Sequence, residues 1–283
     1  MGLGMIRDAF LKGLQLTSRE WKGIFREFLA VNAFALLILL FSVIAGGAMI
    51  FFGMNGGAEM ASISGAIIII VLFLLVSSAA SSISYNIIEE RISGLKHDIW
   101  GDFRKNLLPV SAYTIILWLT IGIFAFLPTF VLGLLESGSF VSEIALGLAS
   151  QIYYYLALFL IGFVLQFSLF ELVIAKAAVL QSMGKSVSIV KRTGIETMLF
   201  YIIGGIFSTM VQILLSIPAL ALIFLPLWVL MNAEAQFADP RLMVSLIMFG
   251  GLYVFAILVV FMAAKLTITL PINYYYWRMA REA

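Results

Sequence analysis

Six long apolar runs, separated by short polar or charged links, dominate the pattern of this chain. Each run has about 20 residues or more, the length that an α-helix needs to cross the hydrocarbon core of a bilayer. The pattern therefore predicts an all-α polytopic membrane helix bundle that forms a single domain over residues 1–283. The predicted spans cover residues 28–52, 62–84, 108–132, 144–173, 198–230 and 242–270.

The links alternate in length and in charge. Links 54–61, 135–143 and 231–241 are short, whereas links 85–107 and 174–197 are longer and charged. Fifteen of the 17 Lys and Arg residues lie in the N-terminal segment, the two longer links and the C-terminal tail. Cytoplasmic segments of membrane proteins carry an excess of these residues. We therefore expect both termini on the cytoplasmic side of the cell membrane.

Composition supports this class and excludes several chemistries. The chain is 63% hydrophobic and 11% charged, whereas soluble domains carry about 25% charged residues. It contains no cysteine, which excludes disulfides and thiolate chemistry. No P-loop, G-x-G-x-x-G, H-E-x-x-H or G-x-S-x-G motif is present. We therefore predict no catalytic residue, cofactor, metal or nucleic-acid partner; the lipid bilayer is the expected environment.

The N-terminal segment, residues 1–27, has an amphipathic pattern. Apolar residues such as Ile6 and Phe10 share one helical face, with charged residues opposite. Thr17 and Glu20 form a T-x-x-E capping box that predicts the start of a helix running into the first span. This pattern is typical of a helix that lies in the membrane interface.

The two longer links repeat this plan. In link 85–107, Trp100 and Phe103 echo Trp21 and Phe25 of the N-terminal segment, with spacings that differ by one or two residues. Link 174–197 is a looser echo. The pattern predicts a threefold repeat, in which each cytoplasmic amphipathic helix is followed by a hairpin of two helices. Convergence on generic amphipathic patterning explains the same residues, and both interpretations stay open.

Prolines within the spans predict helix kinks at Pro128, Pro218 and Pro226, because proline removes a backbone donor. The simpler interpretation is a packing kink. The alternative is an unwound substrate site in the fifth span, as in transporters with discontinuous helices.

Glu171 and Lys265 are the only charged residues inside the apolar runs, and both fall near the inner interface. We interpret them as an intramembrane ion pair or as side chains that reach the interface separately. The alternative is a pair that couples or gates transport.

Small and polar residues recur in the spans. Five serines lie close together in the second span, at Ser77, Ser78, Ser81, Ser82 and Ser84, and small-xxx-small pairs occur at Ser42/Gly46, Gly204/Ser208 and Gly205/Thr209. We interpret all of these as helix-packing surfaces. The alternative is a polar conduit lined by the serines with Asn32, Gln166 and Gln212.

Two aromatic clusters and one histidine complete the candidates. The clusters 153–155 and 274–277 are typical of membrane-interface anchors. His97, the single histidine, lies among acidic residues without a recognised metal-ligand spacing. A solvated link is therefore the favoured interpretation of this segment.

Two stretches carry a resemblance to a known family. They are Gly94-Leu-Lys-His-Asp-Ile-Trp-Gly-Asp-Phe-Arg-Lys-Asn-Leu-Leu-Pro109 and Ala178-Val-Leu-Gln-Ser-Met-Gly-Lys-Ser-Val-Ser-Ile-Val-Lys-Arg192. They resemble links of the membrane domain found with glycerophosphoryl diester phosphodiesterases and of related six-helix proteins of bacteria and archaea. The phosphodiesterase barrel is absent from this chain, so the resemblance implies a six-helix membrane fold and no catalysis.

A second resemblance points to ABC-2-type permease subunits. The segment Ile88-Glu-Glu-Arg-Ile-Ser-Gly-Leu95 is similar to their E-R-x-x-G-x-L element after the second helix. It implies that Glu89, Glu90, Arg91 and Gly94 form a loop that couples to a separate cytoplasmic ATPase. The short link 231–241 departs from the long outer segment of those permeases.

Three functions follow from these patterns. The first is a non-enzymatic membrane protein that organises the membrane or supports transport through its own bundle, alone or with another membrane subunit. The second is an ABC-2-type permease subunit. The third, a membrane-embedded enzyme, lacks the convergent polar residues that catalysis needs.

Overall fold

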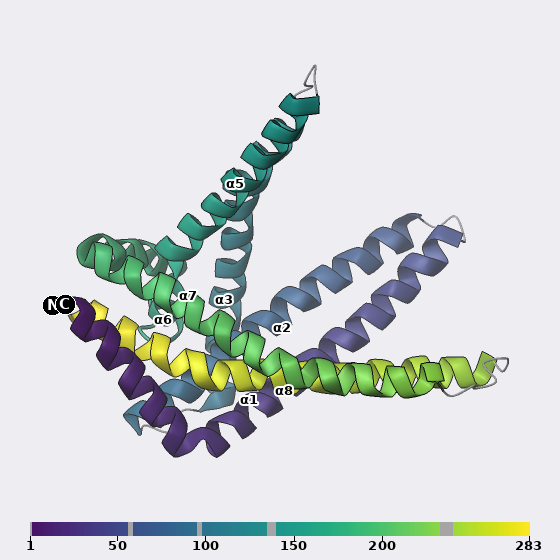
Figure 1. The fold of residues 1–283 in the computed structure, drawn as a ribbon, viewed down its shortest axis with the longest axis horizontal. Helices are drawn as coiled ribbons and strands as arrows, with labels where there is room; N and C mark the ends of the chain where they lie inside the picture. The colour runs from purple at the N-terminus through teal and green to yellow at the C-terminus, as the bar shows by residue number, and fades with distance from the viewer. Residues whose placement is uncertain (1, 56–58, 95–97, 135–139, 233–239) are drawn as a thin grey trace.

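The computed structural model describes residues 2–55, 59–94, 98–134, 140–232 and 240–283 (Figure 1). These residues form helices joined by short links, and they include no strand. Six helices are long and apolar enough to cross a membrane by length and composition, the same number as the predicted spans. These stretches run over Leu3–Ile50, Ile63–Ser93, Phe103–Val131, Ile144–Val173, Val179–Leu222 and Tyr253–Glu282.

The elements follow one another along the chain with few interruptions. They are α1 (Gly2–Asn55), α2 (Glu59–Ser93), α3 (Ile99–Ile121), the π-helix η1 (Gly122–Phe126), α4 (Leu127–Gly133), α5 (Phe140–Leu165), α6 (Ser168–Val173), α7 (Val179–Asn232) and α8 (Pro240–Glu282).

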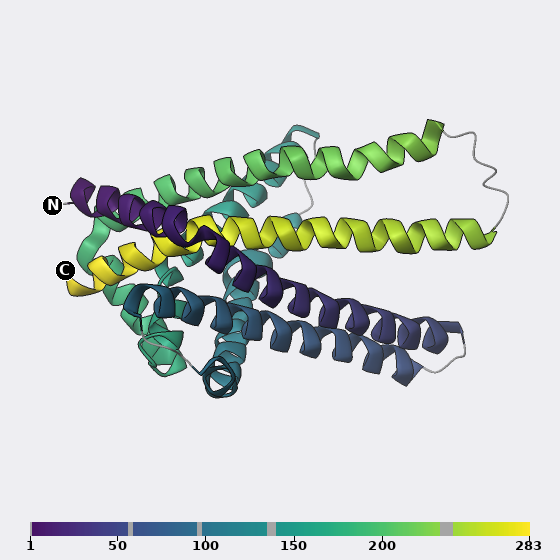
Figure 2. The same ribbon diagram turned by 90° about the horizontal axis from the view of Figure 1, so that it is seen from below.

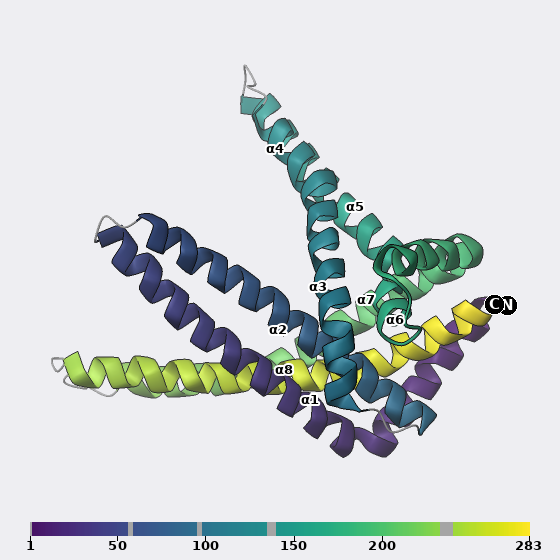
Figure 3. The same ribbon diagram turned by 180° about the vertical axis from the view of Figure 1, so that it is seen from behind.

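Consecutive helices pair into hairpins that meet at one end of the molecule. α1 packs on α2, the α3–η1–α4 rod packs on α5, and α7 packs on α8. Figures 1 and 2 show these hairpins spreading from a common end, where both termini lie, and Figure 3 shows α4 and α5 standing apart from α1 and α2. We call this common end the base. The pairing is the one the sequence predicts, while the threefold repeat stays a prediction.

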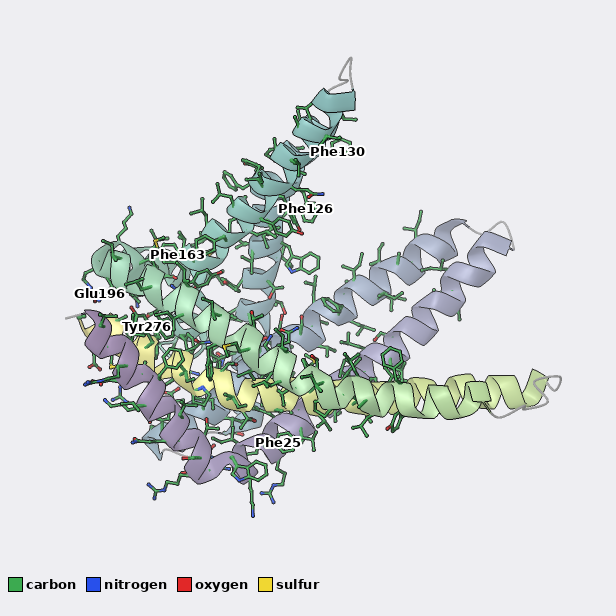
Figure 4. The ribbon with its side chains drawn as sticks, in the orientation of Figure 1. Phe25, Phe126, Phe130, Phe163, Glu196 and Tyr276 are labelled. Atoms are coloured by element: carbon green, nitrogen blue, oxygen red, sulfur yellow. The ribbon has the colours of Figure 1, made fainter. Side chains whose placement is uncertain are left out.

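The hydrophobic core lies at the base. Its most buried members include Phe28 of α1, Ile88 of α2, Phe167 beside α6 and Tyr276 of α8. Away from the base the hairpins carry exposed apolar side chains on their outer faces, such as Phe126 and Phe130 in Figure 4. In a membrane these faces contact lipid, because lipid chains are as apolar as the side chains themselves.

The predicted helix start at Thr17 is wrong. α1 is helical from Gly2 to Asn55 and changes direction near the base in Figure 1. The Thr17 hydroxyl donates to the carbonyls of Gly13 in its own helix and Thr267 in α8, both at 3.0 Å. Contacts with α8 therefore keep this stretch helical, and the hydroxyl links two helices instead of capping one.

The apolar face of the N-terminal segment packs against the protein itself. Ile6 and Ala9 are buried in the core at the base, and the ring of Phe10 makes edge contacts with Phe200 and Phe207 of α7. Other apolar side chains of this segment, including Trp21, stay exposed. Much of the face that the sequence assigns to the membrane interface is therefore covered by α7 and α8.

Close helix packing at the predicted Ser42/Gly46 pair is confirmed. A Cβ atom added to Gly46 would lie 2.8 Å from the carbonyl oxygen of Gly65 in α2, and one added to Gly65 would lie 2.6 Å from the carbonyl oxygen of Gly46. Ser42 is buried beside this contact. Only glycine at both positions lets the two backbones approach this closely.

The backbone breaks do not all fall at the predicted prolines. η1 ends two residues before Pro128, with the Leu127 amide donating to the Gly122 carbonyl five residues earlier. α7 stays helical through Pro218 and Pro226, so it is not unwound at either residue. It leaves helical geometry at Gly194 instead, where φ is +43° and ψ is −112°. A positive φ favours glycine, which has no Cβ to clash.

Candidate functional site

The Glu171 carboxylate is buried at the base and surrounded by partners from α7 and α8. Its side chain is 1% exposed. The Trp277 indole N–H donates to Oε1 at 3.0 Å, and Nε of Arg281 lies 3.2 Å from the same oxygen. Nζ of Lys185 lies 3.7 Å from Oε2. Two cations thus compensate the charge, and one indole donates a hydrogen bond, at a carboxylate that would be costly to bury alone.

A helix break places Glu171 at this position. α5 ends at Leu165 and α6 begins at Ser168. The Ser186 hydroxyl of α7 bridges the break: it accepts from the Phe167 amide at 3.2 Å and donates to the Val164 carbonyl at 2.7 Å. The exposed backbone groups are satisfied in this way, which lets the short α6 turn Glu171 toward α8.

The predicted pair of Glu171 with Lys265 is not the pair that the structure shows. The Lys265 ammonium donates to Oε1 of Gln212 in α7 at 3.0 Å. The carboxylate instead takes Arg281 and Lys185, which both belong to the charged base. The hydropathy pattern puts both charges near one interface, but it does not show which helix ends meet there.

The aromatic cluster 274–277 has a different environment from the membrane interface that its sequence pattern predicts. Tyr274, Tyr276 and Trp277 are predicted as interface anchors, yet all three are buried in the core. The Tyr276 ring stacks on Phe200 with centroids 3.7 Å apart, and Figure 4 shows it at the base. The guanidinium of Arg281 lies 5.5 Å from the Trp277 ring centroid. The spacing of Trp277 and Arg281, four residues apart on one helical face, was the available signal.

The segment predicted to couple to an ATPase is tied to α1. Arg91 forms an ion pair with Glu27 and a second one, at 3.5 Å, with Glu20. Gly94 follows the last residue of α2 with φ at +69°, and its amide donates to the Glu90 carbonyl at 2.9 Å. Leu95 and His97 lie outside the described residues, and the part of the chain that is described holds no acidic or histidine cluster suited to a metal.

The residues of the predicted polar conduit are not gathered together. The Asn32 amide donates to the carbonyl of Phe28 in its own helix at 2.8 Å. Gln212 pairs with Lys265, while Gln166 lines a cavity whose wall includes neither of the other two amides. Ser78 and Ser82 are buried in α2 without a hydrogen-bond partner among the described residues.

The cavity that contains Gln166 has a volume of about 660 Å³ and lies where α1, α2, α5, α6, α7 and α8 converge. Gly204 and Gly205 form part of its wall, and a Cβ added at either would meet no atom within 4 Å. The predicted packing role of these glycines is therefore wrong, because they face open space. Six phenylalanines also line the cavity: Phe10, Phe159, Phe167, Phe170, Phe200 and Phe207.

A second cavity, of about 460 Å³, lies beside the Glu171 cluster. Its charged lining includes Arg278 and Arg281 together with Glu89 and Glu282. Arg281 already pairs with Glu171, and Nε of Arg278 lies 3.7 Å from Glu282. These contacts make it a site of internal ion pairs at the base.

Comparisons with protein families, curated proteins and solved structures find no match to this chain. Six apolar helices, a buried charge cluster at the base and an aromatic cavity beside it are therefore the basis on which its function is argued.

Proposed function

We propose that this chain is a non-enzymatic, multi-pass protein of the cell membrane that organises the inner leaflet through its cation-rich base. In this proposal the termini and the two longer links are cytoplasmic. The support is that both termini lie together at the base in Figure 1, and that 15 of the 17 Lys and Arg residues belong to the segments that sequence analysis assigns to the cytoplasm.

The observation that carries this proposal is a row of exposed cations on α1. Lys12, Arg19, Lys22 and Arg26 are exposed, and no acidic side chain of the described residues forms a salt bridge with them. Cations near a membrane surface attract anionic lipid headgroups with about 1 kcal/mol each. This row would collect anionic lipids around the base.

The permease alternative has less support. It requires the segment around Arg91 to be available to an ATPase, yet Arg91 is paired with Glu20 and Glu27. Arg91, which is part of the segment that resembles the permease element, thus links α2 to α1 by ion pairs.

Spin-labelled lipids in reconstituted vesicles test the proposal directly. We expect phosphatidylglycerol to be enriched around the protein over phosphatidylcholine, and the enrichment to fall with added salt because salt screens exposed charges. Neutralising all four cations to Gln should remove the enrichment, whereas the control Lys265→Gln, in a predicted span, should retain it. Equal binding of the two lipids by the unaltered protein would overturn the proposal.

Thiol labelling tests the orientation, because the chain has no cysteine of its own. Ser137→Cys, in a predicted outer link and outside the described residues, should react with an impermeant maleimide in intact cells. Ser188→Cys, exposed near the start of α7, should react only after the cells are opened. The reverse pattern would place the base outside the cell.

Purification under mild detergent separates the proposal from the permease alternative. We expect no ATPase subunit to accompany the full chain. A stably bound ATPase in stoichiometric amount would make the permease the better description.

A further inference from the structure

We infer that the aromatic cavity beside α6 binds one membrane glycerolipid, with an acyl chain among the phenylalanines and an ester carbonyl at Gln166. This inference deepens the proposed function, on whose membrane location it rests. The cavity volume of about 660 Å³ falls in the range of small-molecule sites, roughly 300–1,000 Å³.

An orphaned polar atom identifies the chemistry of the ligand. Nε2 of Gln166 is buried and has no hydrogen-bond partner among the described residues, and Gln166 lines the cavity. A buried amide donor without an acceptor costs free energy, so such an atom calls for a partner that the chain itself does not supply. The ligand must therefore present an acceptor oxygen inside an otherwise apolar cavity.

The remainder of the wall is suited to a hydrocarbon chain. Phenylalanine rings surround the space, and the open glycines Gly204 and Gly205 leave room beside α7. The lining of α7 extends from Phe200 to Met210, a rise of about 15 Å at 1.5 Å per residue. A chain lying along this wall would pass Gln166 at one end and reach toward the middle of the bundle.

The cavity is placed where such a lipid would enter. Most of its lining comes from the base-proximal parts of three candidate spans, Ile144–Val173, Val179–Leu222 and Tyr253–Glu282, and Phe10 and Tyr85 of the first two spans complete it. Ile202 and Ile206 line the cavity and are also exposed on the outer surface. In the proposed membrane placement the surroundings at that depth are lipid, and an ester carbonyl is the acceptor that lipids carry next to their chains.

Native mass spectrometry of the full chain in mild detergent tests the inference. We expect the purified protein to retain one glycerolipid. Gly204→Leu, which adds a bulky side chain to the cavity wall, should reduce retention strongly. The matched control Gly147→Leu should leave it unchanged, because Gly147 on α5 also has no atom within 4 Å of an added Cβ and lies outside the cavity lining.

The Gln166→Leu variant tests the carbonyl contact separately. It keeps the apolar volume and removes the donor, so retention should weaken about 2- to 10-fold, the value of one net hydrogen bond. Unchanged retention in this variant would overturn the placement of the carbonyl. Retention of a quinone without any glycerolipid would overturn the ligand class.

Photo-crosslinking keeps the inference falsifiable if Gly204→Leu fails to fold. Unaltered protein would be reconstituted with phosphatidylcholine that bears a diazirine on one acyl chain. The crosslinks should map to the α7 segment 200–210, including its cavity-lining residues, at high and low salt alike. Labelling that is confined to the exposed segment 148–156 of α5 would overturn the inference. Because this probe is zwitterionic, its result is independent of the anionic-lipid test of the proposed function.

Discussion

The Tyr153 hydroxyl of α5 donates a hydrogen bond of 2.8 Å to the carbonyl oxygen of Phe124 in η1. Phe124 lies four residues before Pro128, so in a regular α-helix its carbonyl would accept from the amide that proline lacks. Tyr153, on the other helix of the hairpin, thus supplies a donor to the carbonyl that Pro128 leaves without its usual amide partner. This contact assigns a structural role to one member of the 153–155 cluster, which sequence analysis placed at a membrane interface.

Replacing Tyr153 with Phe should destabilise the α3–α5 hairpin. The change removes only the hydroxyl, so the expected loss is about 1 kcal/mol of the free energy of unfolding, the value of one hydrogen bond. Thermal unfolding in detergent measures it. Tyr155→Phe is the matched control, because that side chain is 67% exposed and has no hydrogen bond among the described residues. Equal effects of the two substitutions would contradict the assigned role.

The Glu171 cluster should depend on Arg281 and not on Lys265. We expect Glu171→Gln to cost about 1–3 kcal/mol, since it leaves buried donors with a weaker acceptor. Glu282→Gln, at a side chain that is 72% exposed, should cost under about 1 kcal/mol.

A double-mutant cycle identifies the partner of Glu171. Combining Glu171→Gln with Arg281→Met should give a coupling energy of about 0.5 kcal/mol or more, because the two side chains lie 3.2 Å apart. Combining Glu171→Gln with Lys265→Met should give additive effects within experimental error. Coupling to Lys265 in place of Arg281 would restore the pair that the sequence predicted.

The crossing of α1 and α8 should not tolerate a side chain at Gly13. A Cβ there would lie 2.6–2.8 Å from atoms of Ile272, including backbone atoms of α8. Gly13→Val should therefore destabilise the protein by roughly 1–3 kcal/mol, the usual cost of overpacking. Gly4→Val, where an added Cβ meets no atom within 4 Å, is the control for the effect of valine on helix propensity. Unfolding of both variants in detergent compares them; similar losses would argue against close packing at Gly13.

Hydropathy predicts the spans because few backbone conformations satisfy their hydrogen bonds inside a bilayer. A polar backbone in lipid must satisfy its hydrogen bonds internally, so a long apolar run becomes a helix whatever its neighbours are. This holds for α2 and α8 as it does for the others. The charge pattern alone, however, does not show which helix ends converge, and for this reason the partner of Glu171 was assigned to Lys265 and not to Arg281.

Local patterns fail where tertiary packing decides the outcome. Ser42/Gly46 and Gly204/Ser208 have the same small-xxx-small spacing, yet Gly46 meets the backbone of α2 while Gly204 faces a cavity. Likewise Thr17 has the sequence of a helix cap but lies inside α1, because α8 supplies its second acceptor. Each difference depends on a helix distant in sequence, which no local window contains.

The C-terminal end of α8 should loosen when Arg192 is replaced. Nη2 of Arg192 donates to the carbonyls of Ala280 and Arg281, both at 2.8 Å. The last carbonyls of a helix lack intrahelical partners, so this side chain acts as a cap contributed by α7. Arg192→Gln should raise amide hydrogen exchange in the last turns of α8, near Trp277, and thereby weaken the hold on Glu171. Lys191→Gln is the control, because Lys191 is exposed and has no salt bridge or hydrogen bond among the described residues. Since the two variants remove the same charge from adjacent positions, exchange that rises equally in both would attribute the effect to net charge and contradict the cap.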